Sequence, residues 1–202
     1  MTSRLCIDKL LRERFDKAVE LYREWNGKIN VISRKDSDYI WSHHFRHSLS
    51  IAEFIDFATG ETVLDLGTGG GFPGVPLAIL RPDVHFVLCD SIGKKTLVAT
   101  EVARALGLDN VDVVRSRVED LPGRWDWVVT RAVADLSVLY PWVRGRYGRG
   151  LVCLKGGDVA SEISAFVRKF RVNPSCIHVR PVSDVYDEEY FREKFVIHIE
   201  KI

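Results

Sequence analysis

The sequence predicts an α/β fold built on a mostly parallel sheet, and three observations support that class. Five apolar segments between residues 62 and 154 have the length and β-branched composition of buried strands. Helical patterns follow most of these strands, and such alternation predicts a parallel sheet covered by helices on both faces. Two further strand patterns near the C-terminus have no helix between them, which predicts an antiparallel strand at one edge.

A glycine-rich loop follows the first of these strands, in the segment Thr62–Gly74, T-V-L-D-L-G-T-G-G-G-F-P-G. Glycines permit a tight turn and let the backbone approach a ligand, and the helix predicted for residues 75–80 points its N-terminus at the same place. Asp65 lies two residues before the first glycine. Asp90 ends the next strand, where a carboxylate grips ribose hydroxyls. We therefore predict a nucleotide-type cofactor at this loop, with a ligand-free tight turn as the alternative.

Helices precede the first strand. Apolar residues at helical spacing predict a helix over residues 7–25. Ser33 and Asp36 resemble a capping box for a second helix, which would run to Ala58 with a bend near Ser48. We expect residues 1–60 to form a helical extension that packs on a sheet domain of residues 61–202, and the two to make one compact unit.

Beyond the glycine loop, strands and helices are predicted in alternation, and most of their boundaries coincide with turn residues. Trp125 and Trp127 alternate within one predicted strand, which places both side chains on the same face. The predicted strands are residues 84–89, 111–115, 125–130, 151–154, 176–180 and 195–200, and the predicted helices are residues 94–106, 136–144 and 159–170.

Ligands of parallel sheets bind beyond the carboxyl ends of the strands, so the residues just after each strand are candidates for the site. Val118 beside Glu119 suits the sandwiching and hydrogen bonding of a base. Arg131 ends a strand and precedes small residues, so it faces the cleft. The candidates are Asp65, Gly67, Gly69, Gly71 and Phe72 after the first strand, Asp90 after the second, Val118 and Glu119 after the third, Arg131 after the fourth and Lys155 after the fifth.

Composition narrows the class of protein. The hydrophobic content of 46% and the charged content of 28% are typical of a folded globular protein. The four cysteines are scattered without zinc spacing, and we expect Cys89 and Cys153 to be small buried hydrophobes. No segment approaches the ~20 apolar residues of a membrane span. We therefore expect a cytoplasmic protein without a metal site.

A net charge of +1 excludes a globally basic nucleic-acid-binding surface, so contact with a polyanion must come from local clusters. We favour the R-G-R-Y-G-R-G stretch at residues 144–150, because it is basic, is rich in glycine and contains Tyr147, which can stack on a base. The alternative is a solvated turn. The other clusters are Arg34 and Lys35, Lys94 and Lys95, and residues 168–171.

With these residues assembled, the chain resembles the class I S-adenosylmethionine-dependent methyltransferases over nearly its whole length. More narrowly, it is similar to the small-subunit rRNA guanine-N7 methyltransferases of the glucose-inhibited division protein B type. The G-F-P-G-V-P and R-A-V-A runs are specific to that family. The matching segments are Trp25–Asn30 (W-N-G-K-I-N), His44–Leu49 (H-F-R-H-S-L), Val63–Ile79, Asp90–Lys95 (D-S-I-G-K-K), Arg117–Glu119 (R-V-E), Thr130–Ala134 (T-R-A-V-A) and Leu154–Gly156 (L-K-G).

The resemblance implies a Rossmann-like class I methyltransferase fold with S-adenosylmethionine as the cofactor. Arg131 and Lys155 are the implied catalytic residues: Arg131 would contact the cofactor carboxylate or guide the guanine, and Lys155 a phosphate or the guanine O6. Many relatives have Asp where this chain has His47. The implied cofactor residues are Gly67, Phe72, Val118, Glu119 and Arg131, with Asp65, Gly69, Gly71 and Asp90 added by the general fold.

The resemblance also implies methyl transfer to N7 of a guanine in 16S rRNA, either in the free RNA or in the small ribosomal subunit or its precursor. We expect no DNA or membrane partner, and we favour a monomer. Guanine N7 has a lone pair and no proton, so the reaction needs positioning rather than a general base. The chain lacks the strand-four cysteine of pyrimidine-C5 methylation, and it has T-R-A-V-A in place of the Asn/Asp-Pro-Pro-aromatic turn of amine methylation.

Three alternatives stay open. A methyltransferase for another RNA or for a small molecule would turn over without rRNA. A nicotinamide-dependent oxidoreductase would also use Asp90 for a ribose, but Asp65 disfavours it. A non-catalytic RNA-binding module would bind RNA without consuming cofactor, although the intact glycine loop argues against a degenerate site.

Overall fold

The computed structural model describes residues 4–33 and 36–201, in which a seven-stranded sheet has the order β3-β2-β1-β4-β5-β7-β6. Pairing is parallel from β3 through β5, which confirms the predicted class. β7 is antiparallel to both β5 and β6. The strands are β1 (Thr62–Leu66), β2 (His85–Asp90), β3 (Val111–Arg115), β4 (Trp125–Arg131), β5 (Tyr147–Gly156), β6 (Ile177–Pro181) and β7 (Lys194–Glu200).

The two late strands form an antiparallel pair at one edge of the sheet, as the sequence predicts. β7 inserts between β5 and β6, and β6 forms the edge. β7 reads K-F-V-I-H-I-E, and its buried residues Val196, Ile197 and Ile199 supply both hydrophobic clusters. β6 buries less of its surface, so it takes the exposed edge position.

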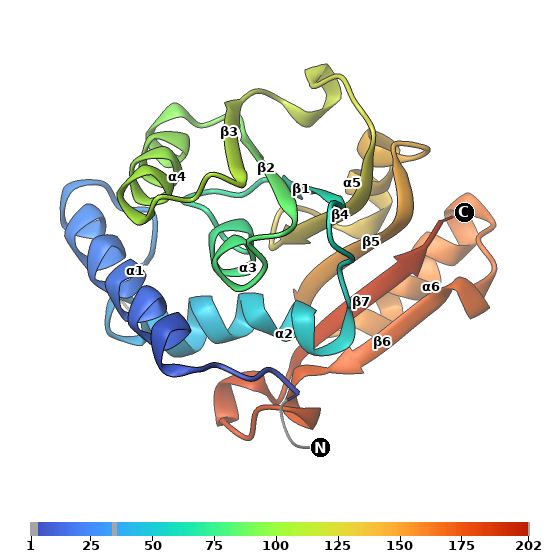
Figure 1. The fold of residues 1–202 in the computed structure, drawn as a ribbon. Helices are drawn as coiled ribbons and strands as arrows, with labels where there is room; N and C mark the ends of the chain where they lie inside the picture. The colour runs from blue at the N-terminus through green and yellow to red at the C-terminus, as the bar shows by residue number, and fades with distance from the viewer. Residues whose placement is uncertain (1–3, 34–35, 202) are drawn as a thin grey trace.

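Helices cover both faces of the sheet, with α1 to α4 on one face and α5 and α6 on the other (Figure 1). The link from β3 to β4 contains a short 3₁₀ turn, Val118–Asp120, in place of a helix. None of the helices in residues 4–33 and 36–201 is long and apolar enough to cross a bilayer. The helices are α1 (Lys9–Lys28), α2 (His47–Phe54), α3 (Gly74–Leu80), α4 (Gly93–Leu106), α5 (Leu136–Val143) and α6 (Val159–Phe170).

The second N-terminal helix differs from the expected regular helix with a bend near Ser48. A 3₁₀ turn at Ser37–Tyr39 leads into a π-helical segment, Ile40–Arg46, which continues as α2. α2 ends at Phe54 rather than at Ala58 because the backbone becomes extended at the next residue. π-helical turns inside helices are frequently found at functional sites.

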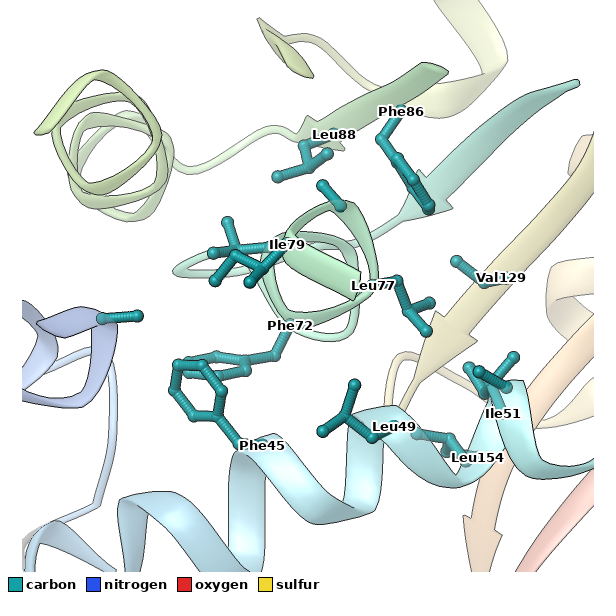
Figure 2. Packing of buried hydrophobic residues seen from close by; sticks show 14 of the residues in the cluster. Phe45, Leu49, Ile51, Phe72, Leu77, Ile79, Phe86, Leu88, Val129 and Leu154 are labelled. Atoms are coloured by element: carbon teal, nitrogen blue, oxygen red, sulfur yellow. The ribbon is translucent and has the colours of Figure 1, made fainter. Parts of the chain in front are cut away.

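One hydrophobic cluster joins the N-terminal helices to the sheet domain. Phe72 packs between Tyr22 of α1 and Phe45 of the π-helical segment, with ring centroids 4.5 and 5.6 Å apart. Figure 2 shows α3 lying between α2 and the strands, with Leu77 directed into this layer. Burial of each such side chain stabilises the fold by ~1.5–3 kcal/mol, so the extension and the sheet share one core. The boundary at residue 60 stays a prediction.

Trp125 and Trp127 are both buried, but they belong to different hydrophobic clusters. The register between β4 and β5 shifts at this point, because Trp125 pairs with Tyr147 and Trp127 with Gly150. Two steps along β4 therefore match three steps along β5, and such a bulge increases the local twist. The placement of both rings on one face stays a prediction from the alternation along β4.

Candidate active site

A cavity of about 1010 Å³ opens at the carboxyl ends of the parallel strands, where ligands bind in open α/β sheets. Eight of the predicted site residues line it. Asp65 and Gly71 do not. The eight are Gly67, Gly69, Phe72, Asp90, Val118, Glu119, Arg131 and Lys155.

The glycine loop is fixed to the end of β2. The amides of Gly67 and Thr68 both donate to the carbonyl oxygen of Cys89, at 2.8 and 3.0 Å. The Gly69 amide donates to Oδ2 of Asp90 at 2.9 Å, and the Ile92 amide to its Oδ1 at 2.8 Å. Asp90 therefore lines the cavity and holds the loop in shape.

The loop needs glycine where it approaches the segment after β4. Gly67 has φ 69°, which only glycine adopts at low cost. A Cβ at this position would lie 2.3 Å from Cγ2 of Val133. The Gly67 backbone therefore lies directly against the Val133 side chain at the cavity wall.

Asp65 lies beneath the loop rather than in the cavity. Its Oδ2 accepts hydrogen bonds from the Thr68 hydroxyl at 2.6 Å and from the Gly74 amide at 2.7 Å. The residue is completely buried, and burial raises the pKa of Asp65 to about 7. Gly71 also faces away from the cavity, since a Cβ there would meet the Tyr22 hydroxyl at 2.5 Å. Both residues shape the loop from behind.

The 3₁₀ turn with Val118 and Glu119 forms one wall of the cavity and is anchored by Arg146. The guanidinium of Arg146 donates to the carbonyl oxygens of Val118 and Trp142, at 2.8 and 3.1 Å. Trp142 also lines this wall. Arg146 is therefore a structural residue that holds the wall in place.

This arrangement removes Arg146 from the stretch at residues 144–150 that we favour for RNA contact. Arg144 and Arg149 are exposed, and RNA contact through them stays a prediction. β5 begins at Tyr147, four residues earlier than predicted, and pairing with β4 draws the stretch into the sheet. Tyr147 is only 3% exposed, so its ring is not free to stack on a base. Arg149 forms a salt bridge with Glu61 at 2.8 Å.

The other predicted basic clusters lie in different surroundings. Lys95 lines the cavity next to the glycine loop, whereas Lys94 is exposed. Arg168 and Lys169 are exposed at the C-terminal end of α6, where positive charge suits the helix dipole. Arg34 and Lys35 lie outside the described residues.

The glycine loop lies at one end of the cavity, and Arg131 is the central residue of the other end. Its Nη2 lies 3.0 Å from Nδ1 of His44, its Nη1 donates to the His43 carbonyl oxygen at 3.4 Å, and its guanidinium lies 5.0 Å from the centroid of the Phe72 ring. An arginine only donates, so Nδ1 of His44 accepts and its proton is on Nε2. Burial and the nearby Arg131 lower the pKa of His44 to about 3, so the ring is neutral.

His44, His47, Tyr190 and Lys194 also line this end, although none of them follows a parallel strand. The rule of strand ends therefore does not select them, and the only sequence signal was the H-F-R-H run. His47 is 5% exposed, and burial together with Arg131 lowers its pKa. Within the described residues, Nε2 of both histidines is buried without a hydrogen-bond partner.

Lys155 lines the cavity but is held by neighbours. Its Nζ forms an ion pair with Oε1 of Glu162 at 2.7 Å and also contacts the carbonyl oxygen of Ala134. The Leu136 amide donates to the same carboxylate oxygen at 2.7 Å. Lys155 therefore ties β5 to α6 and to the segment after β4, with one ammonium proton left for a ligand.

The site offers neither a metal centre nor a thiolate nucleophile. No group of three His, Cys, Asp or Glu residues able to hold a metal is present in the part of the chain that the structure describes. Burial raises the pKa of Cys89 to about 11 and that of Cys153 to about 12, so both are thiols at neutral pH. The cavity is suited to holding two reactants against each other rather than to covalent catalysis.

The family model for rRNA small subunit methyltransferase G, GidB, matches residues 12–181 of this chain. The chain belongs to the GidB family. The ribosomal RNA small subunit methyltransferase G of Bacteroides fragilis is 46% identical over 196 residues, which cover 93% of this chain and 92% of that protein. The protein of the same name from Porphyromonas gingivalis is 47% identical over 197 residues, with 93% and 86% covered.

Solved structures show that the GidB fold is shared with methyltransferases. A magnesium protoporphyrin IX methyltransferase from Synechocystis PCC 6803, solved with bound SAM, has a TM-score of 0.62 at 14% identity, with 100% of each chain covered. A SAM-dependent methyltransferase from Aquifex aeolicus has a TM-score of 0.59 at 17% identity, and the match covers 84% of this chain and 96% of that one.

Proposed function

We propose that this chain transfers a methyl group from S-adenosylmethionine to N7 of a guanine in small-subunit (16S) rRNA. The observation that carries the proposal is a single cavity with two chemically different ends. The glycine loop and Asp90 offer backbone groups and a carboxylate at one end, and Arg131, Lys155 and Lys194 offer cations at the other. Membership of the GidB family supports rRNA as the acceptor.

The glycine-loop end fits the nucleoside part of this cofactor. Asp90 would accept hydrogen bonds from the ribose hydroxyls, and the exposed Glu119 beside Val118 would hold the base. Gly67 supplies a backbone surface that a Cβ would fill. When bound, S-adenosylmethionine supplies a methyl group on a sulfonium cation. Asp65 would act indirectly, by keeping the loop in shape.

At the other end, the residues would orient a guanine. Its N7 has a lone pair and no proton, so no residue has to remove one. Alignment of the two reactants is then the main catalytic contribution. Arg131, at this cation-rich end, is fixed by His44 and Phe72, so it would set the position of either the cofactor carboxylate or the base. Lys155 would contact a phosphate or the guanine O6 with its remaining proton.

Transfer of radiolabelled methyl from S-adenosylmethionine tests the proposal. The acceptor is small-subunit RNA from a strain that lacks this modification, and RNA that is already modified serves as the matched control. We expect incorporation into the first RNA alone. Incorporation into large-subunit RNA or a small molecule instead would assign another acceptor, and an absence of cofactor binding would overturn the assignment of the glycine loop.

We further propose that the protein acts in the cytoplasm, because that is where bacterial small-subunit RNA is assembled, and that DNA is not a substrate. A monomer stays a prediction. Analytical ultracentrifugation of the purified chain would test it directly.

A further inference from the structure

Three aromatic rings form a continuous stack beside the cation-rich end of the cavity. The Tyr39 and His43 ring centroids are 4.7 Å apart with 14° between the planes. The His43 and Tyr190 centroids are 3.7 Å apart with 8° between the planes. Stacking this close to parallel makes the three rings one flat-sided column, which we call the aromatic column.

Further contacts hold the two inner rings of the aromatic column, His43 and Tyr190, in place. Nδ1 of His43 lies 2.9 Å from Oδ1 of Asp36. The Tyr190 hydroxyl donates to the carbonyl oxygen of His43 at 3.3 Å, which joins segments 147 residues apart. Nζ of Lys194 lies 5.2 Å from the Tyr190 ring centroid. Because these contacts fix the rings in advance, a ligand that stacks on the column would lose little entropy in ordering it.

The two ends of the aromatic column face different surroundings. Tyr190 lines the active-site cavity together with Lys194. Tyr39 is 53% exposed, so the outer ring is accessible to solvent. The column therefore leads from the place where the target base would bind to an open aromatic surface.

A second cavity of about 500 Å³ borders the turn that carries Tyr39, although Tyr39 itself does not line it. Ser37, Asp38 and Ile40 line it, and these are the residues on both sides of Tyr39. Arg23 and Lys28, which are exposed near the C-terminal end of α1, line its other side with two asparagines. The two cations of this cavity exceed its one carboxylate, Asp38. Together with the open aromatic ring on the adjoining turn, they suit a nucleotide, with the base on the ring and a phosphate near the cations.

We propose that the aromatic column is a platform for the RNA strand that carries the target guanine. A base near the target stacks on the outer face of Tyr39, and the adjoining phosphates lie in the second cavity against Arg23 and Lys28. The strand is single-stranded at this point, because only an unpaired base presents a free face to the ring. This inference rests on the proposed function and adds the direction in which the RNA leaves the active site.

Paired substitutions of Tyr39 test stacking. Tyr39→Leu keeps the apolar volume and removes the aromatic face, whereas Tyr39→Phe removes only the hydroxyl. Loss of one stacked base weakens binding about tenfold, so we expect Tyr39→Leu to raise KM for RNA about tenfold, with the loss appearing in KM rather than in kcat. Tyr39→Phe keeps the KM of the unaltered protein. Val138→Ala, at a 49% exposed apolar position on the opposite face of the sheet, is the matched control.

Salt dependence tests the phosphate contacts. For a single strand, each neutralised phosphate contributes about 0.7 to the slope of log Kd against log salt, so the double variant Arg23→Gln with Lys28→Gln should lose about 1.4. Equal KM for Tyr39→Leu and the unaltered protein would overturn the proposal, as would an unchanged salt slope. If the unaltered protein methylates no RNA, the proposed function fails. Fluorescence anisotropy with a single-stranded RNA then tests the platform separately. Weaker RNA binding by Tyr39→Leu than by Tyr39→Phe would support it, and equal binding would overturn it.

Discussion

Nη2 of Arg131 lies 3.0 Å from Nδ1 of His44, and this hydrogen bond joins the end of β4 to the π-helical segment before α2. It connects the residue that ends a core strand to the N-terminal helices. The bond also fixes the tautomer of His44, because an arginine cannot accept. The N-terminal extension therefore positions a side chain of the active site as well as covering the sheet.

Arg131→Ala removes a cation from the cation-rich end of the cavity. We expect methyl transfer to fall by about 100-fold or more, the usual scale for loss of a positioned charged donor. The fold should survive, because the hydrophobic cluster still joins the N-terminal helices to the sheet, and an unchanged far-ultraviolet circular dichroism spectrum would show it. Arg168→Ala, at the exposed end of α6, is the control and should transfer methyl at the normal rate. A near-normal rate for Arg131→Ala would remove Arg131 from the site.

His44 should act through Arg131 as a positioning residue. His44→Ala takes away the acceptor for Nη2, and we expect kcat to fall about tenfold, the cost of one hydrogen bond to a charged group. His44→Asn offers a carbonyl oxygen near the position of Nδ1 and should restore most of kcat. A merely structural role for the ring would affect both variants equally in a thermal unfolding experiment and would leave kcat unchanged.

Gly67→Ala introduces both a strained φ and a collision with Val133. We expect cofactor affinity, measured by isothermal titration calorimetry, to fall at least tenfold. Val133→Ala in the same chain removes the collision but leaves the strain of about 1 kcal/mol, so the double variant should recover part of the affinity. Equal affinities for the unaltered protein and Gly67→Ala would show that the loop does not approach the ligand.

Asp65 gives the protein a pH dependence of stability with a defined sign. Its pKa is raised from 3.8 to about 7, chiefly by burial, so the folded chain binds a proton that the unfolded chain releases above pH 3.8. The free energy of unfolding therefore falls as pH rises from about 4 to 7, by a few kcal/mol in total from this group. In Asp65→Asn, this contribution to the fall in the free energy of unfolding between about pH 4 and 7 should be absent.

Chemical unfolding at pH 5 and pH 8 measures the effect of Asp65. The asparagine carbonyl oxygen can still accept from Thr68 and Gly74, so the loop should keep its shape. We compare the free energy of unfolding of Asp65→Asn with that of the unaltered protein at each pH. We expect this difference to be more favourable to the variant at pH 8 than at pH 5. A constant difference between the two proteins at both pH values would contradict the raised pKa.

Structural features that depend on residues close together along the chain are predicted well from the sequence. The glycine loop, the helix predicted for residues 94–106 and most strands are set by local patterns, and the structure confirms them. The turn Val118–Asp120 comes just after β3, and the rule that site residues follow the parallel strands predicts its place in the site. Local chemistry is sufficient for these features.

Features that depend on distant partners were not predictable. Arg146 looks like an exposed RNA contact until the sheet brings the Val118 carbonyl to it. His44 has no special spacing, and its role arises only because the π-helical segment before α2 lies against the end of β4. The insertion of β7 between β5 and β6 depends likewise on which strand can bury both faces.

The central claim is transfer of a methyl group to guanine N7, and aniline cleavage of the methylated RNA tests it most directly. N7-methylguanine makes the strand labile, so primer extension after aniline treatment maps each modified position. We predict one new stop at a single guanine of small-subunit RNA, present with the unaltered protein and absent with Arg131→Ala. Methyl incorporation without any aniline-sensitive position would place the methyl on another atom and contradict the account.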